Sequence, residues 1–223
     1  MRRELLTAFL SVIVLTVLLG FVYPMLVTGV SQGIFPGNAN GQLVKRGGVV
    51  VGSKIIGQQF YEPVIGRNGK QVVKGGVAQT QPDPRYFQTR PSGTSDNAAS
   101  SAFTNYGPND KATLEAFQGY IATYLALNVG PDKKPYDPAV TSAAQVPVDA
   151  ATDSASSVDP QISVANADIQ AYRIAAVRHL TLATVDALVS KYTNDRSLGF
   201  LGEPGVNVLE LNLALDRLTG SAK

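Results

Sequence analysis

The sequence contains no cysteine, no tryptophan and a single histidine, His179. Without cysteine the chain cannot build a disulfide framework, a thiolate metal site, an Fe–S cluster or a cysteine nucleophile. A single histidine also leaves any multi-histidine zinc or iron site without its ligands. These absences exclude most metal and thiol chemistry from a chain of 223 residues.

Charge is also scarce and nearly balanced. Lys and Arg number 19 and Asp and Glu 17, a net charge of +2, which argues against a nucleic-acid-binding protein that relies on many phosphate contacts. Residues 5–44 contain no Asp, Glu, Lys, Arg or His. Residues 1–60 hold five Lys and Arg against one Glu, and the remainder holds 14 against 16, so the excess of basic residues lies at the apolar end.

The long uncharged stretch predicts a membrane anchor. Residues 5–23 are almost all apolar, and a helix of about 19 residues is roughly 28 Å long, close to the hydrocarbon thickness of a bilayer. We expect an anchor over residues 1–35, with the span at about 5–25, followed by a domain over 36–223. Pro24 and the glycines beyond it predict that the helix ends or kinks in the middle to late twenties. A cleaved signal peptide is the alternative, with Gly29 and Ser31 as small residues before a cut, although its apolar core would be shorter.

The distribution of basic residues predicts how the anchor is oriented. Arg2 and Arg3 directly precede the span, whereas Lys45 and Arg46 lie well beyond it, which favours a cytoplasmic N-terminus and an extracytoplasmic domain. Within the span, one helical face collects Thr16, Gly20 and Tyr23. Small residues four apart allow close helix packing, so this face is a candidate for docking on another membrane helix. The alternative is that such residues simply occur in membrane helices.

The rest of the chain predicts an α+β fold, with helices packed on a small sheet. A strand is expected near residues 49–56, with hairpins or mobile loops at the glycine pairs that flank short valine segments. Three helices are expected. The first starts at an Asn109 or Asp110 cap and ends before Gly130, with an apolar stripe of Leu114, Phe117, Ile121 and Leu125. The second spans 163–180 and has an apolar face of Ile169, Tyr172, Ala176 and Leu180. The third spans 184–192 and is capped by Thr184. An extended loop is expected over 133–157, and the alternating pattern of 206–213 predicts a strand with a bulge.

No motif indicates an autonomous enzyme. Residues 52–59 have the glycine spacing of a phosphate-binding loop, but Gln58 stands where that loop needs lysine. Ser154, Asp159 and His179 could be drawn as a catalytic triad, yet no nucleophile motif accompanies them, and a charge at a helix end is a sufficient role for His179. We therefore expect no catalytic residue and no metal site.

Short segments through nearly the whole chain form a recognisable signature, which begins with Tyr23-Pro24 at the end of the span. Its other pieces are FP at 35–36, ANG at 39–41, GS at 52–53, IGQ at 56–58, Phe60, YF at 86–87, RPS at 90–92, NYGPN at 105–109, SASSVDPQIS at 154–163, RIA at 173–175, GEP at 202–204 and VNVLELNLALD at 206–216. Together these segments resemble the C subunit of the bacterial Kdp system, a high-affinity ATP-driven potassium pump.

This resemblance implies a non-catalytic subunit in the cell inner membrane. The implied partners are a P-type ATPase subunit that hydrolyses ATP, a channel-like subunit that carries K⁺, and a very small membrane subunit. ATP and K⁺ would be handled by these partners, and the C subunit would act in assembly and as a catalytic chaperone that raises ATP affinity. An alternative is a membrane-tethered exported enzyme or ligand-binding module unrelated to a pump.

The family motifs also indicate candidate partner-contact residues in the domain. These are Ser154, Ser156, Asp159, Arg173, Glu203, Asn207 and Asn212. A capped loop that enters a helix is the simpler explanation for 154–163, with Ser163 as the cap. The chain departs from the usual family pattern at Ser157 (commonly Gly), Gln161 (commonly His) and Gly205 (commonly Arg), and residues 63–84 resemble an insertion.

Overall fold

The computed structural model describes residues 1–103, 105–107 and 109–220. The chain forms two compact units, Met1–Ser53 and Lys54–Lys223. The hairpin formed by Leu43–Arg46 and Val49–Ser53 belongs to the first unit, whereas the sequence predicted it in the domain after the anchor.

The first unit begins with one continuous apolar helix of 33 residues, Arg2–Ile34. It consists of α1 (Arg2–Val17), a π-helical turn (Leu18–Val22) and α2 (Tyr23–Ile34), and none of its side chains is buried. Its length and composition suit a membrane span, as expected. The expected end or kink in the twenties is wrong, because the π-turn adapts the backbone just ahead of Pro24: the Tyr23 N–H bonds to the Leu18 carbonyl, five residues back. Proline is tolerated in the first turn that follows.

A short helix and a hairpin complete this unit. α3 (Pro36–Ala39) is followed by strands β1 (Leu43–Arg46) and β2 (Val49–Ser53), which pair antiparallel. Gly47 and Gly48 form the turn with positive φ angles of 56° and 84°, a conformation that suits glycine. The strand expected near 49–56 is confirmed over β2.

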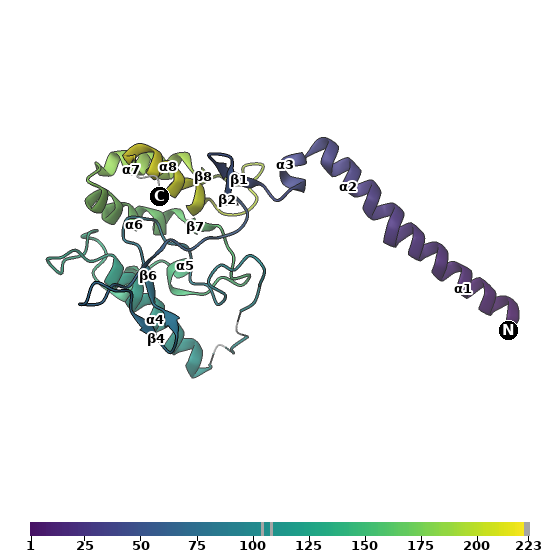
Figure 1. Ribbon diagram of the computed structural model, residues 1–223, viewed down its shortest axis with the longest axis horizontal. Coiled ribbons are helices and arrows are strands. Elements are labelled where there is room, and N and C mark those ends of the chain that lie inside the picture. The colour runs from purple at the N-terminus through teal and green to yellow at the C-terminus, as the bar shows by residue number, and fades with distance from the viewer. Residues whose placement is uncertain (104, 108, 221–223) are drawn as a thin grey trace. The chain divides into compact units, whose positions relative to one another are not determined.

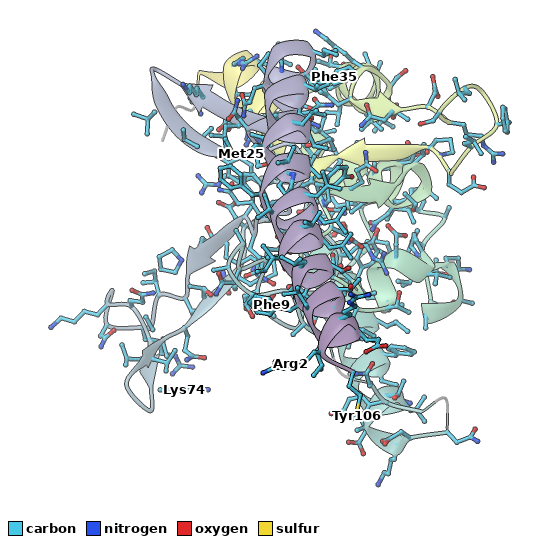
Figure 2. All side chains as sticks on the ribbon, turned by 90° about the vertical axis from the view of Figure 1, so that its right-hand side faces the viewer. Arg2, Phe9, Met25, Phe35, Lys74 and Tyr106 are labelled. Atoms are coloured by element: carbon cyan, nitrogen blue, oxygen red, sulfur yellow. The ribbon has the colours of Figure 1, made fainter. Side chains whose placement is uncertain are left out.

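The second unit opens with a pair of small hairpins, which we call the β-arm (residues 61–82). Strand β3 (Tyr61–Pro63) pairs with β6 (Thr80–Pro82) at its base, and β4 (Val73–Lys74) pairs with β5 (Val77–Ala78) around the turn at Gly75 and Gly76. Figure 2 shows the arm extending from the body of this unit, with Lys74 toward its far end. The arm accounts for nearly all of the segment that resembles an insertion.

The body of this unit is an α+β domain, which confirms the expected fold class (Figure 1). A three-stranded antiparallel sheet has the order β7 (Gln161–Ser163), β9 (Gly205–Asn207), β8 (Thr193–Asn194). The helices are α4 (Lys111–Leu127), α5 (Val148–Ala151), α6 (Val164–Arg178), α7 (Leu182–Lys191) and α8 (Val208–Thr219), with a short 3-10 turn at Ala143–Gln145. Helix α5 and the 3-10 turn interrupt the loop expected over 133–157.

One hydrophobic core joins the sheet to α6, α7 and α8. Its buried side chains are Phe87, Ile162, Ala167, Ala171, Ile174, Ala175, Val185, Val189, Val206, Val208, Leu211 and Leu215. Burying a Val, Leu, Ile or Phe side chain contributes about 1.5–3 kcal/mol, so this cluster is the main source of the domain's stability.

Two of the expected helix starts are confirmed and one is wrong. Asp110 caps α4 by accepting from the Ala112 N–H at 2.7 Å, and Ser163 caps α6 by accepting from the Asn166 N–H at 3.1 Å. α7 starts earlier than expected, because the cap is Thr181, whose Oγ1 accepts from the Thr184 N–H at 3.2 Å. Pro108, in the turn predicted to introduce α4, lies outside the described residues.

The strand expected over 206–213 is wrong beyond Asn207. Asn207 accepts from the Glu210 N–H at 3.1 Å and starts α8 there. Val208, Leu211 and Leu215 recur at helical spacing and are all buried, so the helix buries them on one face, whereas a strand would have divided them between two.

The buried faces of α4 and α6 also differ from those expected. On α4 Leu114 is exposed, and Tyr124 is the one buried residue among the described residues of this helix. On α6 Ala176 is exposed and the buried face is 166–167, 170–171 and 173–175. The prediction failed because it placed polar side chains outside, whereas α6 turns its amides and an arginine inward.

Candidate functional site

Arg173 lies at the centre of the domain and is completely buried on α6. Its Nε donates to the Pro84 carbonyl at 3.1 Å, and its Nη2 donates to the Tyr86 carbonyl at 2.8 Å and to Gln170 Oε1 at 2.9 Å. Its Nη1 donates to Asn128 Oδ1 at 2.7 Å. Burial lowers the pKa of Arg173 to about 10, so the guanidinium stays charged at neutral pH. One side chain thus ties α6 to the segment before it and to the end of α4.

A chain of buried polar side chains continues from Arg173 along α6. The Gln170 amide accepts from the Gln88 N–H at 2.8 Å and donates to the Gln88 carbonyl at 3.2 Å and to Asn166 Oδ1 at 2.9 Å. Asn166 Oδ1 also accepts from the Tyr124 hydroxyl at 3.0 Å, while its amide nitrogen donates to Asp149 Oδ2 at 3.0 Å. Burial raises the pKa of Tyr124, which remains a neutral donor. We call Asp149, Asn166, Gln170, Arg173, Asn128 and Tyr124 the α6 network.

The serine-rich loop before β7 is also held by internal hydrogen bonds. Ser156 Oγ donates to Asp159 Oδ1 at 2.9 Å, and Arg90 Nη1 donates to Asp159 Oδ2 at 2.9 Å. Ser154 is buried and its N–H bonds to the Pro91 carbonyl at 2.9 Å. A Cβ on Gly57 would lie 2.6 Å from the Asp159 carbonyl oxygen, so only glycine fits at this crossing.

A cavity of about 250 Å³ lies between the β-arm base, the 88–92 segment and α4. It is lined by Tyr61, Tyr120, Tyr124, Gln59, Gln88, Gln170, Thr89, Arg90, Ser92, Thr123 and four apolar residues. Thr89 donates to Asp96 Oδ2 at 3.0 Å, and burial raises the pKa of Asp96 to about 6. The lining supplies amides, hydroxyls and one cation, but no general base beside a nucleophile.

The possible catalytic motifs do not come together in the described residues. Asp159 bonds to Arg90 and Ser156, and Ser154 Oγ lies 3.2 Å from Ser156 Oγ. His179 ends α6 as an exposed C-cap with φ 56°. No helix follows Gly52 within the described residues up to 103, so the glycines there do not form a phosphate-binding loop. The described part of the chain also contains no group of three or more His, Cys, Asp or Glu side chains that could hold a metal ion.

An exposed apolar loop connects β8 to β9 (residues 195–204). Leu198 is 83% exposed and Phe200 is 69% exposed at its tip. Ser197 and Leu201 exchange backbone hydrogen bonds of 2.9 Å, and Arg196 pairs with Glu203 at 2.7 Å, so the loop has a defined shape. Apolar side chains held outward in this way are typical of an interaction surface.

Comparison with known proteins identifies the family. A family model described as "K+-transporting ATPase, c chain" matches residues 5–217. The potassium-transporting ATPase KdpC subunit of Mycobacterium tuberculosis is 42% identical over 220 residues, which cover 98% of this chain and 100% of that protein. Those of Streptomyces coelicolor (42% over 218 residues, 93% of this chain and 89% of that protein) and Methylococcus capsulatus (42% over 214 residues, 95% and 96%) are similarly related. The chain belongs to the KdpC family.

Membership in the KdpC family makes the chain a subunit of a K⁺-transporting ATPase. Such a subunit works in a complex with partner subunits, and the apolar helix Arg2–Ile34 indicates association with a membrane.

The candidate partner-contact residues divide into exposed and buried groups. Thr16, Gly20 and Tyr23 are exposed on the helix, and Glu203 is exposed on the apolar loop. Ser154, Arg173, Asn207 and Asn212 are buried and bond within the domain, and Ser156 and Asp159 are half-buried. Asn207 also donates to the Lys54 carbonyl at 2.8 Å. Any role of the buried group in partner binding would have to act through the shape of the domain.

The α6 network was missed from the sequence apart from Arg173. Asn166, Gln170 and Arg173 follow one another at spacings of four and three among alanines, which is the signal that they share a helix face with small residues. Polar residues at such spacing normally indicate a solvent-facing stripe, so burial could not be recognised from the pattern alone.

Ser157, Gln161 and Gly205, the residues expected to depart from the family pattern, each make close local contacts. Ser157 has φ 62°, a left-handed conformation that favours glycine. Its buried hydroxyl accepts from the Gly93 N–H at 3.2 Å and donates to the Ala102 carbonyl. Gln161 on β7 is paired with Asn207 and Gly205 on β9 is paired with Ser163, but a Cβ on Gly205 would lie 2.9 Å from Gln161 Oε1. A larger residue at position 205 would therefore require the end of the Gln161 side chain to move.

Proposed function

We propose that this KdpC-family chain is a non-catalytic subunit that assembles and stabilises the potassium-transporting complex. Its helix docks laterally on membrane helices of the partners, and its domain covers the extracytoplasmic side of the K⁺-conducting subunit. The partners are that subunit, the P-type ATPase subunit and a small membrane subunit. ATP and K⁺ are bound by the partners.

The observation that carries this proposal is the helix itself. Arg2–Ile34 has no buried side chain, and its length and apolar composition suit contact with lipid and with other membrane helices. On one face Thr16 and Gly20 are adjacent, with Thr16 Cγ2 3.9 Å from the position of a Cβ on Gly20. Such a small-residue face allows another helix to approach closely. A lone span without an intramembrane charge does not form a permeation path.

An effect on ATP affinity follows as coupling across the membrane. A domain outside the cytoplasm does not reach cytoplasmic ATP, so it acts by binding one conformation of its partners more tightly than another. The exposed loop 195–204, which includes Glu203, is the part of the domain best suited to contact a partner. We expect the ATP affinity of the ATPase subunit to fall when this chain is absent.

Co-purification tests the docking face. We expect Thr16→Leu with Gly20→Leu to reduce recovery of the partner subunits after mild detergent extraction, because both larger side chains block close approach. Thr7→Leu with Ser11→Leu, on nearly the opposite face, is the matched control and should leave recovery unchanged. Equal recovery from both double variants would refute helix docking through this face, and cross-links from the domain to the cytoplasmic ATPase lobes would refute the proposed orientation.

A further inference from the structure

The β-arm concentrates positive charge on an otherwise acidic unit. Residues 64–82 contain Arg67, Lys70 and Lys74 and no Asp or Glu. The unit Lys54–Lys223 holds 15 Lys and Arg against 16 Asp and Glu; without the arm, which contains these three and Glu62, it holds 12 against 15, a net charge of −3. A localised excess of this kind indicates a surface that attracts anions.

The three basic side chains are available for binding. All are exposed, and none of them forms an ion pair within the described residues. The acidic groups at the base of the arm are occupied instead by Arg85, which lies 2.5 Å from Asp83 Oδ2 and 3.8 Å from Glu62 Oε2. Figure 2 shows Lys74 away from the body of the domain, so its ammonium extends into the surroundings.

Exposed apolar side chains lie among these charges. Ile65, Val73 and Val77 are all more than half exposed. Gly75 and Gly76 form the turn between β4 and β5 with φ angles of 57° and 80°, so the tip has no side chains of its own and is narrow. Lysine and arginine interleaved with apolar residues are typical of segments that lie at a membrane interface, where the charges meet phosphates and the apolar groups enter the headgroup boundary.

We propose that the β-arm binds the anionic phospholipid surface of the membrane that holds the helix. Arg67, Lys70 and Lys74 contact lipid phosphates, and Val73 and Val77 insert at the headgroup boundary. A lipid surface is favoured over an acidic protein because the apolar helix already attaches the chain to a membrane and because branched apolar residues separate the charges. The proposal requires membrane association but neither the docking face of the helix nor the side on which the domain lies.

The absence of tryptophan makes a direct test simple, since Val77→Trp would be the only tryptophan in the chain. The full-length variant is placed in nanodiscs of phosphatidylcholine with or without phosphatidylglycerol, with brominated acyl chains as quencher. We expect blue-shifted, quenched emission in the anionic discs, and reversal in about 1 M salt, where screening is strong. Val148→Trp, a 77%-exposed position outside the arm, is the control reporter and should show neither effect.

Removal of the three positive charges is the second test. We expect Arg67→Gln, Lys70→Gln and Lys74→Gln together to lower the ratio of membrane-bound to free arm about 100-fold, or about five-fold per charge. Lys111→Gln, Lys133→Gln and Lys134→Gln remove the same charge from exposed positions outside the arm and should leave quenching unchanged. The proposal would be overturned by equal quenching in neutral and anionic discs, or by an equal loss of quenching in both triple variants. If the emission of the Val77→Trp variant changed only after partner subunits were added, the arm would bind an acidic protein surface and the proposal would also be wrong.

Discussion

Asn212 on α8 holds Phe87 by both of its backbone polar groups. The Phe87 N–H donates to Asn212 Oδ1 at 2.9 Å, and Asn212 Nδ2 donates to the Phe87 carbonyl at 2.9 Å. The two residues are 125 positions apart, and both are buried. Because the chain around Phe87 has no regular secondary structure, this amide takes the place of a neighbouring strand and allows the Phe87 ring to enter the core.

We predict that Asn212→Ala destabilises the domain by about 2–4 kcal/mol, because it leaves a buried N–H and a buried carbonyl without partners. The free energy of unfolding is measured by urea titration of the full chain in detergent, followed by circular dichroism. Gln118→Ala, on the exposed face of α4, is the control and should change stability by less than about 0.5 kcal/mol. If Asn212→Ala also lowered the free energy of unfolding by less than about 0.5 kcal/mol, the segment around Phe87 would be held by other contacts.

The α6 network predicts that neither methionine nor lysine can replace Arg173. Methionine removes every donor to the Pro84 and Tyr86 carbonyls and to two side-chain amides, and lysine cannot match the planar geometry of guanidinium. We expect Arg173→Met and Arg173→Lys each to lower the free energy of unfolding by about 3–5 kcal/mol. Arg217→Met, at an exposed position on α8, should cost little in the same denaturation assay. Near-native stability of Arg173→Lys would contradict the role given to the guanidinium.

Asp96 predicts a pH-dependent contribution to stability. Burial raises the pKa of Asp96 from 3.8 to about 6, so the folded state binds this proton more tightly than the unfolded state. The resulting stabilisation is complete below a pH of about 4 and is lost as the pH rises through about 6. After allowance for solvent screening it amounts to about 1 kcal/mol.

Asp96→Asn should therefore match the wild type below that window and exceed it by about 1 kcal/mol above it, where the wild type carries a buried charge near Asp159. The melting temperature is measured across the pH range, with Asp132→Asn, on an exposed turn, as the control. Parallel wild-type and Asp96→Asn profiles would show that Asp96 titrates at its ordinary pKa.

The left-handed backbone of Ser157 predicts an unusual order of stability among variants at this position. Alanine removes the hydroxyl hydrogen bonds but keeps the left-handed backbone, whereas glycine also relieves the backbone strain. We expect Ser157→Ala to destabilise the domain by about 1–3 kcal/mol, and Ser157→Gly to be about 0.5–1 kcal/mol more stable than Ser157→Ala. Thermal unfolding of the two variants side by side measures the difference, and the reverse order would mean that the left-handed conformation carries no strain.

Local signals allowed much of the fold to be predicted. The caps at Asp110 and Ser163 and the glycine turns depend on neighbouring residues alone, and the apolar helix depends on composition over one segment. The same local signals gave a wrong prediction for residues 206–213. The alternation of apolar residues there suits a strand, while apolar residues three and four apart suit a helix. The long-range partner Phe87 settles that choice by burying Asn212 on a helical face.

The candidate site was less predictable for a related reason. Arg173 and Asn212 were selected by family resemblance, while Asn166 and Gln170 gave no local sign that their partners are Asp149 and Gln88. Buried polar networks depend on contacts between distant segments, and one sequence without its fold does not reveal which segments meet.

The continuous helix has a further consequence for the depth of Pro24. At 1.5 Å per residue its 33 residues extend about 50 Å, well beyond a hydrocarbon layer of about 30 Å. If Arg2 and Arg3 mark one headgroup layer and the helix stands upright, Pro24 reaches the opposite layer. A backbone interruption near that layer costs less than one at the centre of the hydrocarbon, because water is close, and the last turns before Ile34 emerge from the lipid as a solvated stalk.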